Sequence, residues 1–272
     1  WRKYQGERNN IMITYQNLTS IHPEAKIGNN VTIEPFTTIY KDVEIGEGTW
    51  IGSNVTIMDG ARIGSFCKIF PGAVISAIPQ DLKFNNESSI VEIGNYTTIR
   101  ECVTINRGTA ARGITKVGSN CLIMAYSHIA HDCSVGDHSI LSNNTTLAGH
   151  VEIGRGSVLS GLTAIQQFCS VGEFSFVAGG SRVRKDIPPY VKCGKDPLVF
   201  LGINSIGLKR NNFSSDQIKT IEMIYRFIYN SNKNTTQAIE AIEKNFDASF
   251  EKNVIITFME KSRLGILKST SK

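Results

Sequence analysis

The sequence has no apolar run of the ~18 residues that a membrane-spanning helix needs, and it has no dense cluster of lysine and arginine. Its first ten residues are polar and contain no apolar core of a secretion signal. The formal net charge of +5 is spread along 272 residues, which gives no local support for nucleic-acid binding. These absences predict a cytoplasmic protein with no membrane span and no nucleic-acid partner.

Charged residues make up only 19% of the chain and aromatic residues 8%, a composition that is folded but light in charge for an ordinary helical domain. The chain has six cysteines, and without a secretion signal they are expected to be reduced thiols. Residues 1–12 fit none of the later patterns, so we interpret them as a leader or a cloning remnant.

The dominant feature is a repeat of six residues. Of the 28 positions reached in steps of six from Ile21 to Val183, 25 hold isoleucine, leucine or valine; the exceptions are Asp81, Glu87 and Ala111. Four residues after most of these aliphatics stands a small or β-branched residue. A thiol behaves as a compact hydrophobe, so the cysteines of this second series are expected in the core. They are Cys67, Cys121, Cys133 and Cys169, whereas Cys102 and Cys193 lie elsewhere and show no metal-ligand spacing.

Hexapeptide repeats predict a parallel β-helix. Each hexapeptide supplies a short strand and a corner, and three of them close one coil of 18 residues, with the large and the small side chains filling a narrow interior together. Successive coils then pair as parallel strands. Repeats of this kind are typical of a left-handed coil. The predicted fold class is therefore mainly β, with a left-handed parallel β-helix over residues 13–190.

Two breaks interrupt the repeat, at residues 76–91 and 106–116, and the repeat keeps its phase across both. We expect loops that leave a continuing coil. After Val183, two prolines end strand pairing and the apolar spacing becomes helical. Residues 191–272 are therefore predicted to form a small α-helical C-terminal domain, with apolar stripes at Ile218–Ile228, Ala238–Phe246 and Val254–Met259.

Three of the five histidines cluster in the sequence: His128, His131 and His150. A coil of 18 residues places Asp132 next to His150 in one column, and His131 next to Gly149 in another. Gln167 follows one coil later in the second column. Since His131 stands two places after an inward isoleucine, we expect its side chain to face outward.

This combination of residues predicts acyl-transfer chemistry. An imidazole beside a carboxylate is suited to act as a general base near neutral pH. The N–H of a glycine can approach a developing oxyanion closely. The sequence has no nucleophile elbow and no evident activated cysteine, so direct attack by the acceptor is favoured over a covalent intermediate. A surface His–Asp pair without catalytic function is the alternative interpretation.

From Ile21 to Gly265 the chain resembles the bacterial UDP-N-acetylglucosamine O-acyltransferases, the first enzymes of lipid A biosynthesis. The resemblance depends on several stretches of sequence besides the hexapeptides. They are Gln80–Lys83, Ile99–Ile105, Thr115–Gly118, His128–Cys133, Thr146–Val151, Gln167–Cys169, Pro188–Val191 and Gly207–Arg210.

The resemblance implies a homotrimer that transfers a 3-hydroxyacyl chain from an acyl carrier protein to the 3-hydroxyl of UDP-N-acetylglucosamine. It implies no cofactor beyond the phosphopantetheine thioester of the carrier, which is a substrate, and no metal. Catalytic roles fall to His131 as the base, Asp132 as its orienting partner and the N–H of Gly149 as the oxyanion donor. Substrate-binding roles fall to Gln80, Asp81, Lys83, His128, His150, Gln167, Asn204 and Arg210.

Two further expectations concern the acyl donor. Gly179 matches the position that limits acyl-chain length, and a glycine there predicts a long chain. The carrier protein is acidic, and basic residues are expected around the end of the coil to meet it; they are Arg182, Arg184, Lys185, Lys209 and Arg210.

Four positions depart from the family pattern: Asn106 and Gln166 replace histidines, Ile206 a glutamate and Asn211 an arginine. They leave open N-acylation of a 3-amino UDP-sugar analogue. The related N-acyltransferase of the same pathway carries an extra N-terminal domain, for which a repeat that begins by residue 21 leaves no room. An alternative from another class is a zinc carbonic anhydrase-like prism, in which the three clustered histidines would bind metal.

Overall fold

The computed structural model describes residues 12–13, 18–231 and 233–269, which form two compact units that meet in the sequence at Cys133 and Ser134. Most of the predicted leader, residues 1–11, lies outside the described residues. The predicted domain boundary at residue 190 stays a prediction. None of the described helices is both long and apolar enough to cross a lipid bilayer.

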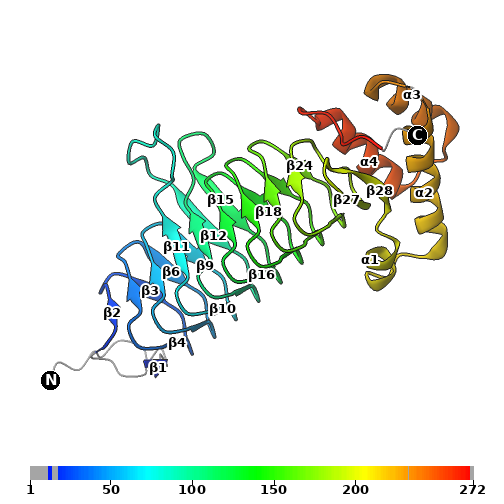
Figure 1. Ribbon diagram of the computed structural model, residues 1–272. Helices are drawn as coiled ribbons and strands as arrows, with labels where there is room; N and C mark the ends of the chain where they lie inside the picture. Colours follow the sequence, from blue (N-terminus) through cyan, green and yellow to red (C-terminus); the bar gives the residue numbers. More distant parts are fainter. Residues whose placement is uncertain (1–11, 14–17, 232, 270–272) are drawn as a thin grey trace. The chain divides into compact units, whose positions relative to one another are not determined.

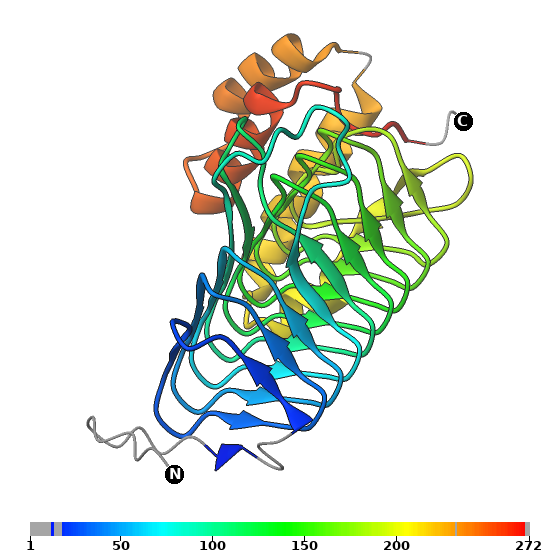
Figure 2. The ribbon, with the colours of Figure 1, turned by 90° about the vertical axis from the view of Figure 1, so that its left-hand side faces the viewer.

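The N-terminal unit consists of short parallel strands in three sheets, which the chain visits in turn (Figure 1; Figure 2). The first sheet holds β1 (Met12–Ile13), β4 (Thr32–Ile33), β7 (Trp50–Ile51), β10 (Lys68–Ile69), β13 (Thr98–Ile99) and β16 (Leu122–Ile123). The second holds β2 (Ser20–Ile21), β5 (Thr38–Ile39), β8 (Thr56–Ile57), β11 (Val74–Ala77), β14 (Thr104–Asn106) and β17 (His128–Ile129). The third holds β3 (Lys26–Ile27), β6 (Val43–Ile45), β9 (Ala61–Ile63), β12 (Ile90–Ile93) and β15 (Ile114–Val117).

The C-terminal unit begins with the same arrangement. The first sheet contains β19 (Ile140–Leu141), β22 (Val158–Leu159), β25 (Phe176–Val177), β27 (Val191–Gly194) and β28 (Val199–Ile203). The second contains β20 (Thr146–Leu147), β23 (Ala164–Ile165) and β26 (Arg182–Val183). The third contains β18 (Ser134–Val135), β21 (Glu152–Ile153) and β24 (Ser170–Val171). Paired residues of the hexapeptide strands are 18 apart, as in Thr146 with Ala164, and those of β25 and β27 are 16 apart. The last pair, β27 with β28, is antiparallel and was not predicted. The parallel β-helix built from hexapeptides is confirmed.

The hexapeptide pattern fills the interior as expected. From Ile33 to Val183 the large aliphatics of the series are buried, and Ile33, Ile57 and Leu159 have no exposed surface. Most hydroxyls in the small series are compatible with burial because they donate to nearby backbone carbonyls, as Thr37 Oγ1 does to Gly52 O at 2.9 Å. The three exceptions to the aliphatic series, Asp81, Glu87 and Ala111, all fall in the segments between strands at the two breaks.

Most corners of the coils hold a residue in the left-handed region of backbone conformation. This residue stands three places after the inward aliphatic, and in most corners it is not glycine: Asn30 has φ +58°, Asp132 +59° and His150 +62°. Asparagine and aspartate tolerate this region best among residues with a side chain. Asp132 and His150 are therefore corner residues, placed by the backbone of the repeat itself.

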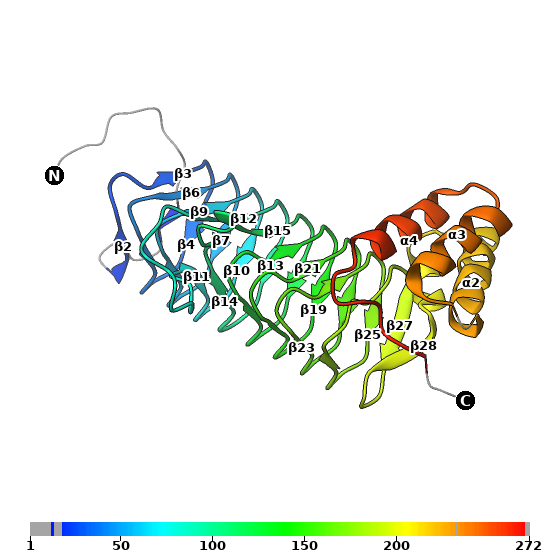
Figure 3. The same ribbon diagram turned by 90° about the horizontal axis from the view of Figure 1, so that it is seen from above.

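In the part of the chain that the structure describes, four helices follow the strands of the C-terminal unit: α1 (Ser205–Arg210), α2 (Ser215–Asn230), α3 (Thr235–Asn245) and α4 (Phe250–Lys261). The last three contact one another (Figure 3) and confirm the three predicted apolar stripes. Ser214 and Gln217 form the capping box at the start of α2, and Tyr225 of α2 donates its hydroxyl to Pro189 O at 2.6 Å.

Candidate active site

A histidine–carboxylate pair lies just after β17 in the N-terminal unit. Nδ1 of His131 is 2.8 Å from Oδ2 of Asp132, and the two residues are 7% and 0% exposed. An ionised carboxylate only accepts hydrogen bonds, so Nδ1 carries the hydrogen and Nε2 carries the lone pair of the neutral ring. The outward orientation of the His131 side chain stays a prediction, and this side chain is nearly buried.

Three hydrogen bonds join Asp132 to two threonines of the second break. The backbone N–H of Thr109 donates to Oδ1 at 3.0 Å, and the Thr109 hydroxyl lies 2.6 Å from Oδ2. The N–H of Asp132 itself donates to Thr115 Oγ1 at 2.8 Å. Buried carboxylates are stable only when such donors replace water. The loop between β14 and β15 is therefore part of the site.

His128 precedes this pair on β17. Its Nδ1 lies 2.7 Å from Thr104 Oγ1 on the adjacent strand β14. Burial of the ring, and then the charge of His131, lower the pKa of His128 below its usual value. His128 is therefore a neutral ring at physiological pH, suited to a hydrogen bond rather than to an ion pair.

The predicted residues of the first break lie in the segment between β11 and β12, which leaves the coil as a loop (Figure 2). The carboxylate of Asp81 accepts from the N–H of Lys83 at 3.0 Å, so this side chain shapes the turn that presents its neighbours. Gln80 and Lys83 are exposed.

Glu87 ties the two loops to each other. Its Oε1 accepts from the N–H of Ala110 in the second loop at 2.9 Å, and its Oε2 accepts from the N–H of Asn85 in its own loop at 2.7 Å. Hydrogen bonds from backbone N–H groups lower the pKa of this carboxyl. The two breaks, which are separate in the sequence, form one connected structure.

Three predicted residues lie near a corner of the C-terminal unit. The His150 ring stacks on Phe168, with ring centroids 4.7 Å apart. Gly149 is buried and its carbonyl accepts from the N–H of Phe168 at 3.2 Å. Gln167 is exposed beside this aromatic residue. Phe168 was not singled out from the sequence, although it orients His150.

Asn204 and Arg210 lie at the two ends of α1. The Asn204 side chain is already engaged: Oδ1 accepts from Gly207 N at 3.2 Å as the N-cap, and Nδ2 donates to Phe174 O at 2.9 Å. This structural role was not predicted. Arg210 is exposed in the last turn of the helix.

Gly179 is exposed after β25, where a Cβ atom would lie 3.1 Å from the carbonyl oxygen of Gly161. The first atom of any side chain at position 179 would therefore lie in close contact with the Gly161 backbone.

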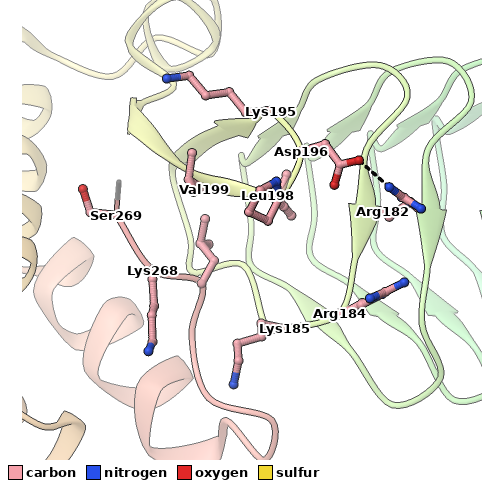
Figure 4. A pocket seen from close by; sticks show the side chains of 11 residues that line it. Arg182, Arg184, Lys185, Lys195, Asp196, Leu198, Val199, Lys268 and Ser269 are labelled. Carbon is pink, nitrogen blue, oxygen red and sulfur yellow. Dashed lines mark hydrogen bonds and ion pairs between the residues drawn. The ribbon is translucent and has the colours of Figure 1, made fainter. Parts of the chain in front are cut away.

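A pocket of about 630 Å³ lies at the end of the strands in the C-terminal unit (Figure 4). Among the described residues, five cationic side chains and one carboxylate line it, together with the apolar residues Pro197, Leu198, Val199 and Leu267. Asp196 pairs with Arg182, and Lys185 donates to the Leu264 carbonyl at 2.9 Å. The cations are Arg182, Arg184, Lys185, Lys195 and Lys268, so the structure brings together three of the predicted basic residues.

Sequence reasoning missed the threonines around Asp132 and the carboxylate of Glu87. A weak signal was available. Asp81, Glu87 and Ala111 interrupt an otherwise regular aliphatic series, which indicates that these segments do not supply side chains to the interior of the coil. The contact between the two loops could not be predicted, because it depends on how each loop folds back.

The chain matches two family models. Residues 186–267 match the model described as UDP N-acetylglucosamine O-acyltransferase, domain 2. Residues 24–49, 42–77 and 114–149 match the bacterial transferase hexapeptide model. A curated acyl-[acyl-carrier-protein]–UDP-N-acetylglucosamine O-acyltransferase from Sulfurihydrogenibium is 44% identical over 92 residues. That match spans about a third of the length of the curated relative, 34% of each protein.

Solved structures match over nearly the whole chain. LpxA, a UDP-N-acetylglucosamine acyltransferase from Bacteroides fragilis, is 47% identical with a TM-score of 0.92, and the match covers 94% of this chain and 100% of that one. The UDP-N-acetylglucosamine acyltransferase of Francisella novicida is 38% identical with a TM-score of 0.92, covering 96% and 95%. The chain therefore belongs to the UDP-N-acetylglucosamine O-acyltransferase family.

Proposed function

We propose that the protein transfers a long 3-hydroxyacyl chain from an acyl carrier protein to the 3-hydroxyl of UDP-N-acetylglucosamine, the first step of lipid A biosynthesis. Membership of the family supports the reaction class, and the names of the relatives supply the two substrates. The observation that carries the proposal is the buried contact between His131 Nδ1 and Asp132 Oδ2 at 2.8 Å.

In the proposed mechanism, Nε2 of His131 removes the proton from the sugar hydroxyl as its oxygen attacks the thioester carbonyl. Asp132 holds the ring in the required tautomer and stabilises the imidazolium that forms. The tetrahedral intermediate then collapses, the C–S bond breaks, and His131 returns the proton to the leaving thiolate of the carrier. The products are the acylated sugar and a free carrier thiol.

The N–H of Gly149 is the proposed donor to the oxyanion of the intermediate. The support for this role is the spacing of 18 residues between His131 and Gly149, which is the spacing of paired residues within the C-terminal unit. A preorganised N–H donor stabilises a developing negative charge more than water does.

We propose no covalent intermediate, and the state of the cysteines supports this. Burial raises the pKa of Cys169 and of Cys193 to about 12, which keeps both thiols protonated and poorly nucleophilic. The fully buried Asp132 fits the role of an orienting partner rather than that of a nucleophile.

Sugar-side contacts are assigned to the loop residues Gln80, Asp81 and Lys83 and to the ring and amide groups of His128, His150 and Gln167. Exposure of Lys83 and Gln167 supports their availability to a ligand. Arg210 is proposed to meet the phosphates. For Asn204 we propose a contact near the uridine through the helix end that it caps, since its side-chain amide already binds the backbone.

The basic pocket in Figure 4 supports an acidic carrier protein as the acyl donor, because the described residues that line it include five cations and one carboxylate. Lys209 and Arg210 add two exposed cations at the end of α1. Gly179 is the proposed limit of acyl-chain length. Replacing it with methionine is expected to shorten the preferred chain.

A cytoplasmic homotrimer is part of the proposal. Phe36 and Tyr126 stand exposed at corners between the first and second sheets of the N-terminal unit, at 59% and 62% exposure, which supports burial against a partner. Light scattering of the purified protein tests the trimer.

The decisive assay offers purified protein a ladder of 3-hydroxyacyl carriers with UDP-N-acetylglucosamine or its 3-amino analogue. Ester formation with the longer carriers is the expected result, and exclusive amide formation would identify the acceptor as the amino sugar. Metal analysis of the same sample separates the other class: stoichiometric zinc with no acyl transfer would favour a carbonic anhydrase-like enzyme.

A further inference from the structure

The second loop carries a threonine that binds both oxygens of the Asp132 carboxylate. The Thr109 N–H donates to Oδ1 at 3.0 Å, and Thr109 Oγ1 lies 2.6 Å from Oδ2. Thr109 is 7% exposed and Asp132 has no exposed surface, so water does not compete strongly for these contacts. One residue therefore fixes the plane of the carboxylate.

The direction of the hydroxyl hydrogen follows from a third contact. The N–H of Ala111 donates to Thr109 Oγ1 at 3.2 Å, so this oxygen already accepts one hydrogen bond. An ionised carboxylate can only accept. The Thr109 hydroxyl is therefore the donor to Asp132 Oδ2, the same oxygen that receives Nδ1–H of His131.

The loop has its own supports and does not depend on Asp132 for its shape. The N–H of Gly113 donates to Thr109 O at 2.7 Å, and that of Gly108 donates to Ile90 O at 3.3 Å. The N–H of Ala110 donates to Glu87 of the first loop at 2.9 Å. Because these contacts hold the loop without Asp132, we take Thr109 as the group that orients the Asp132 carboxylate.

We propose that Thr109 is a positioning residue for acyl transfer: it aims Asp132 Oδ2 at His131 and thereby sets the orientation and basicity of the imidazole. This inference rests on the proposed function. Loss of the hydroxyl would leave the carboxylate with the Thr109 N–H on Oδ1 and His131 on Oδ2, and would leave more negative charge on the oxygen that faces His131.

The experiment compares Thr109→Val, which removes only the hydroxyl hydrogen bonds, with Thr109→Ser, which keeps them. Thr97→Val is the matched control. Thr97 is fully buried in the same unit, and its hydroxyl likewise accepts from an N–H, that of Cys121 at 3.1 Å, and donates to an oxygen, Gly118 O at 2.7 Å. Steady-state kinetics with both substrates, the pH profile of kcat/KM and the melting temperature are measured for each variant.

We expect Thr109→Val to lower kcat about ten-fold, the low end of what one hydrogen bond to a charged group contributes, with both KM values within about two-fold of wild type. The acid limb of kcat/KM should move to higher pH, because the added charge on Asp132 favours the imidazolium. Thr109→Ser should restore both, and Thr97→Val should lower the melting temperature without changing either.

The proposal is overturned if Thr109→Val keeps the kcat and pH profile of wild type, or if Thr97→Val reproduces its effects at an equal loss of melting temperature. Failure of the proposed function looks different. In that case the wild-type protein itself would transfer no acyl group, whereas failure of the Thr109 proposal leaves the wild-type activity intact.

Discussion

The imidazole Nδ1 of His128 lies 2.7 Å from the hydroxyl Oγ1 of Thr104, across a parallel pair of strands that ends at the candidate base. Burial and the nearby charge of His131 lower the pKa of His128 below 6.5 in the folded protein. The unfolded chain therefore binds a proton at a higher pH than the folded protein does.

Stability should consequently decline as the pH falls below the ordinary histidine value of about 6.5, and this loss should end at the lower folded pKa of His128. His128→Gln removes the titrating group. We expect its melting temperature to fall less than that of wild type between about pH 7.5 and pH 5.5. His138→Gln, at an exposed corner residue, serves as the control. Equal declines in all three proteins would contradict the assignment.

Charge reversal in the basic pocket should weaken the interaction with the acyl donor. Arg184→Glu is expected to raise KM for the carrier protein about five-fold at low salt, and less at high salt, because the attraction is screened. KM for the sugar nucleotide should not change. Lys244→Glu makes the same charge change at an exposed site on α3, outside the pocket, and should leave both constants unaltered. An unchanged carrier KM for Arg184→Glu would place the docking surface elsewhere.

Thiol reactivity tests the interior placement of the cysteines. All six are free thiols, five are buried and Cys102 is exposed. A thiol reagent such as Ellman's should therefore modify at most one cysteine per chain, Cys102, rapidly in the native protein, and all six after unfolding. Cys102→Ser should abolish any rapid phase and retain acyl transfer. Two or more rapid thiols would show that the interior is open.

The narrow interior predicts that inward-facing and outward-facing positions differ in how much a larger side chain destabilises the protein. Ala73 belongs to the small inward series and is fully buried, so Ala73→Leu should destabilise the protein by about 1–3 kcal/mol through overpacking. Ala164→Leu places the same side chain on the outer face of β23 and should change stability by less than about 0.5 kcal/mol. Urea unfolding measures both. Equal losses would argue against two distinct faces.

The repeat was sufficient to predict the strands, since the period from Ile21 to Val183 fixes which side chain fills each coil. Helices α2, α3 and α4 were also predictable, because their apolar stripes and capping residues are local signals. The β27–β28 hairpin was not, as Val191–Gly194 and Val199–Ile203 follow two prolines and no longer obey the hexapeptide period. Cys193, outside the small series, is nonetheless buried there.

The candidate site was predictable only in part. The residue types of the adjacent His131 and Asp132 were enough to single them out as a candidate catalytic pair, and the repeat puts Asp132 at a corner. The Thr109 contact joins residues 23 apart across a loop that has no period, so no sequence rule placed it. The same applies to Glu87 and Ala110, whose contact depends on the fold of two separate loops.

The central claim is that His131, oriented by Asp132, is the base for acyl transfer, and turnover by His131→Ala tests it most directly. His138→Ala is the control, because His138 is an exposed histidine at another corner. We predict that His131→Ala loses about 10²–10⁴-fold in kcat while the protein stays folded and assembled, and that His138→Ala keeps normal turnover. Turnover by a folded His131→Ala protein within a few-fold of wild type would contradict the account.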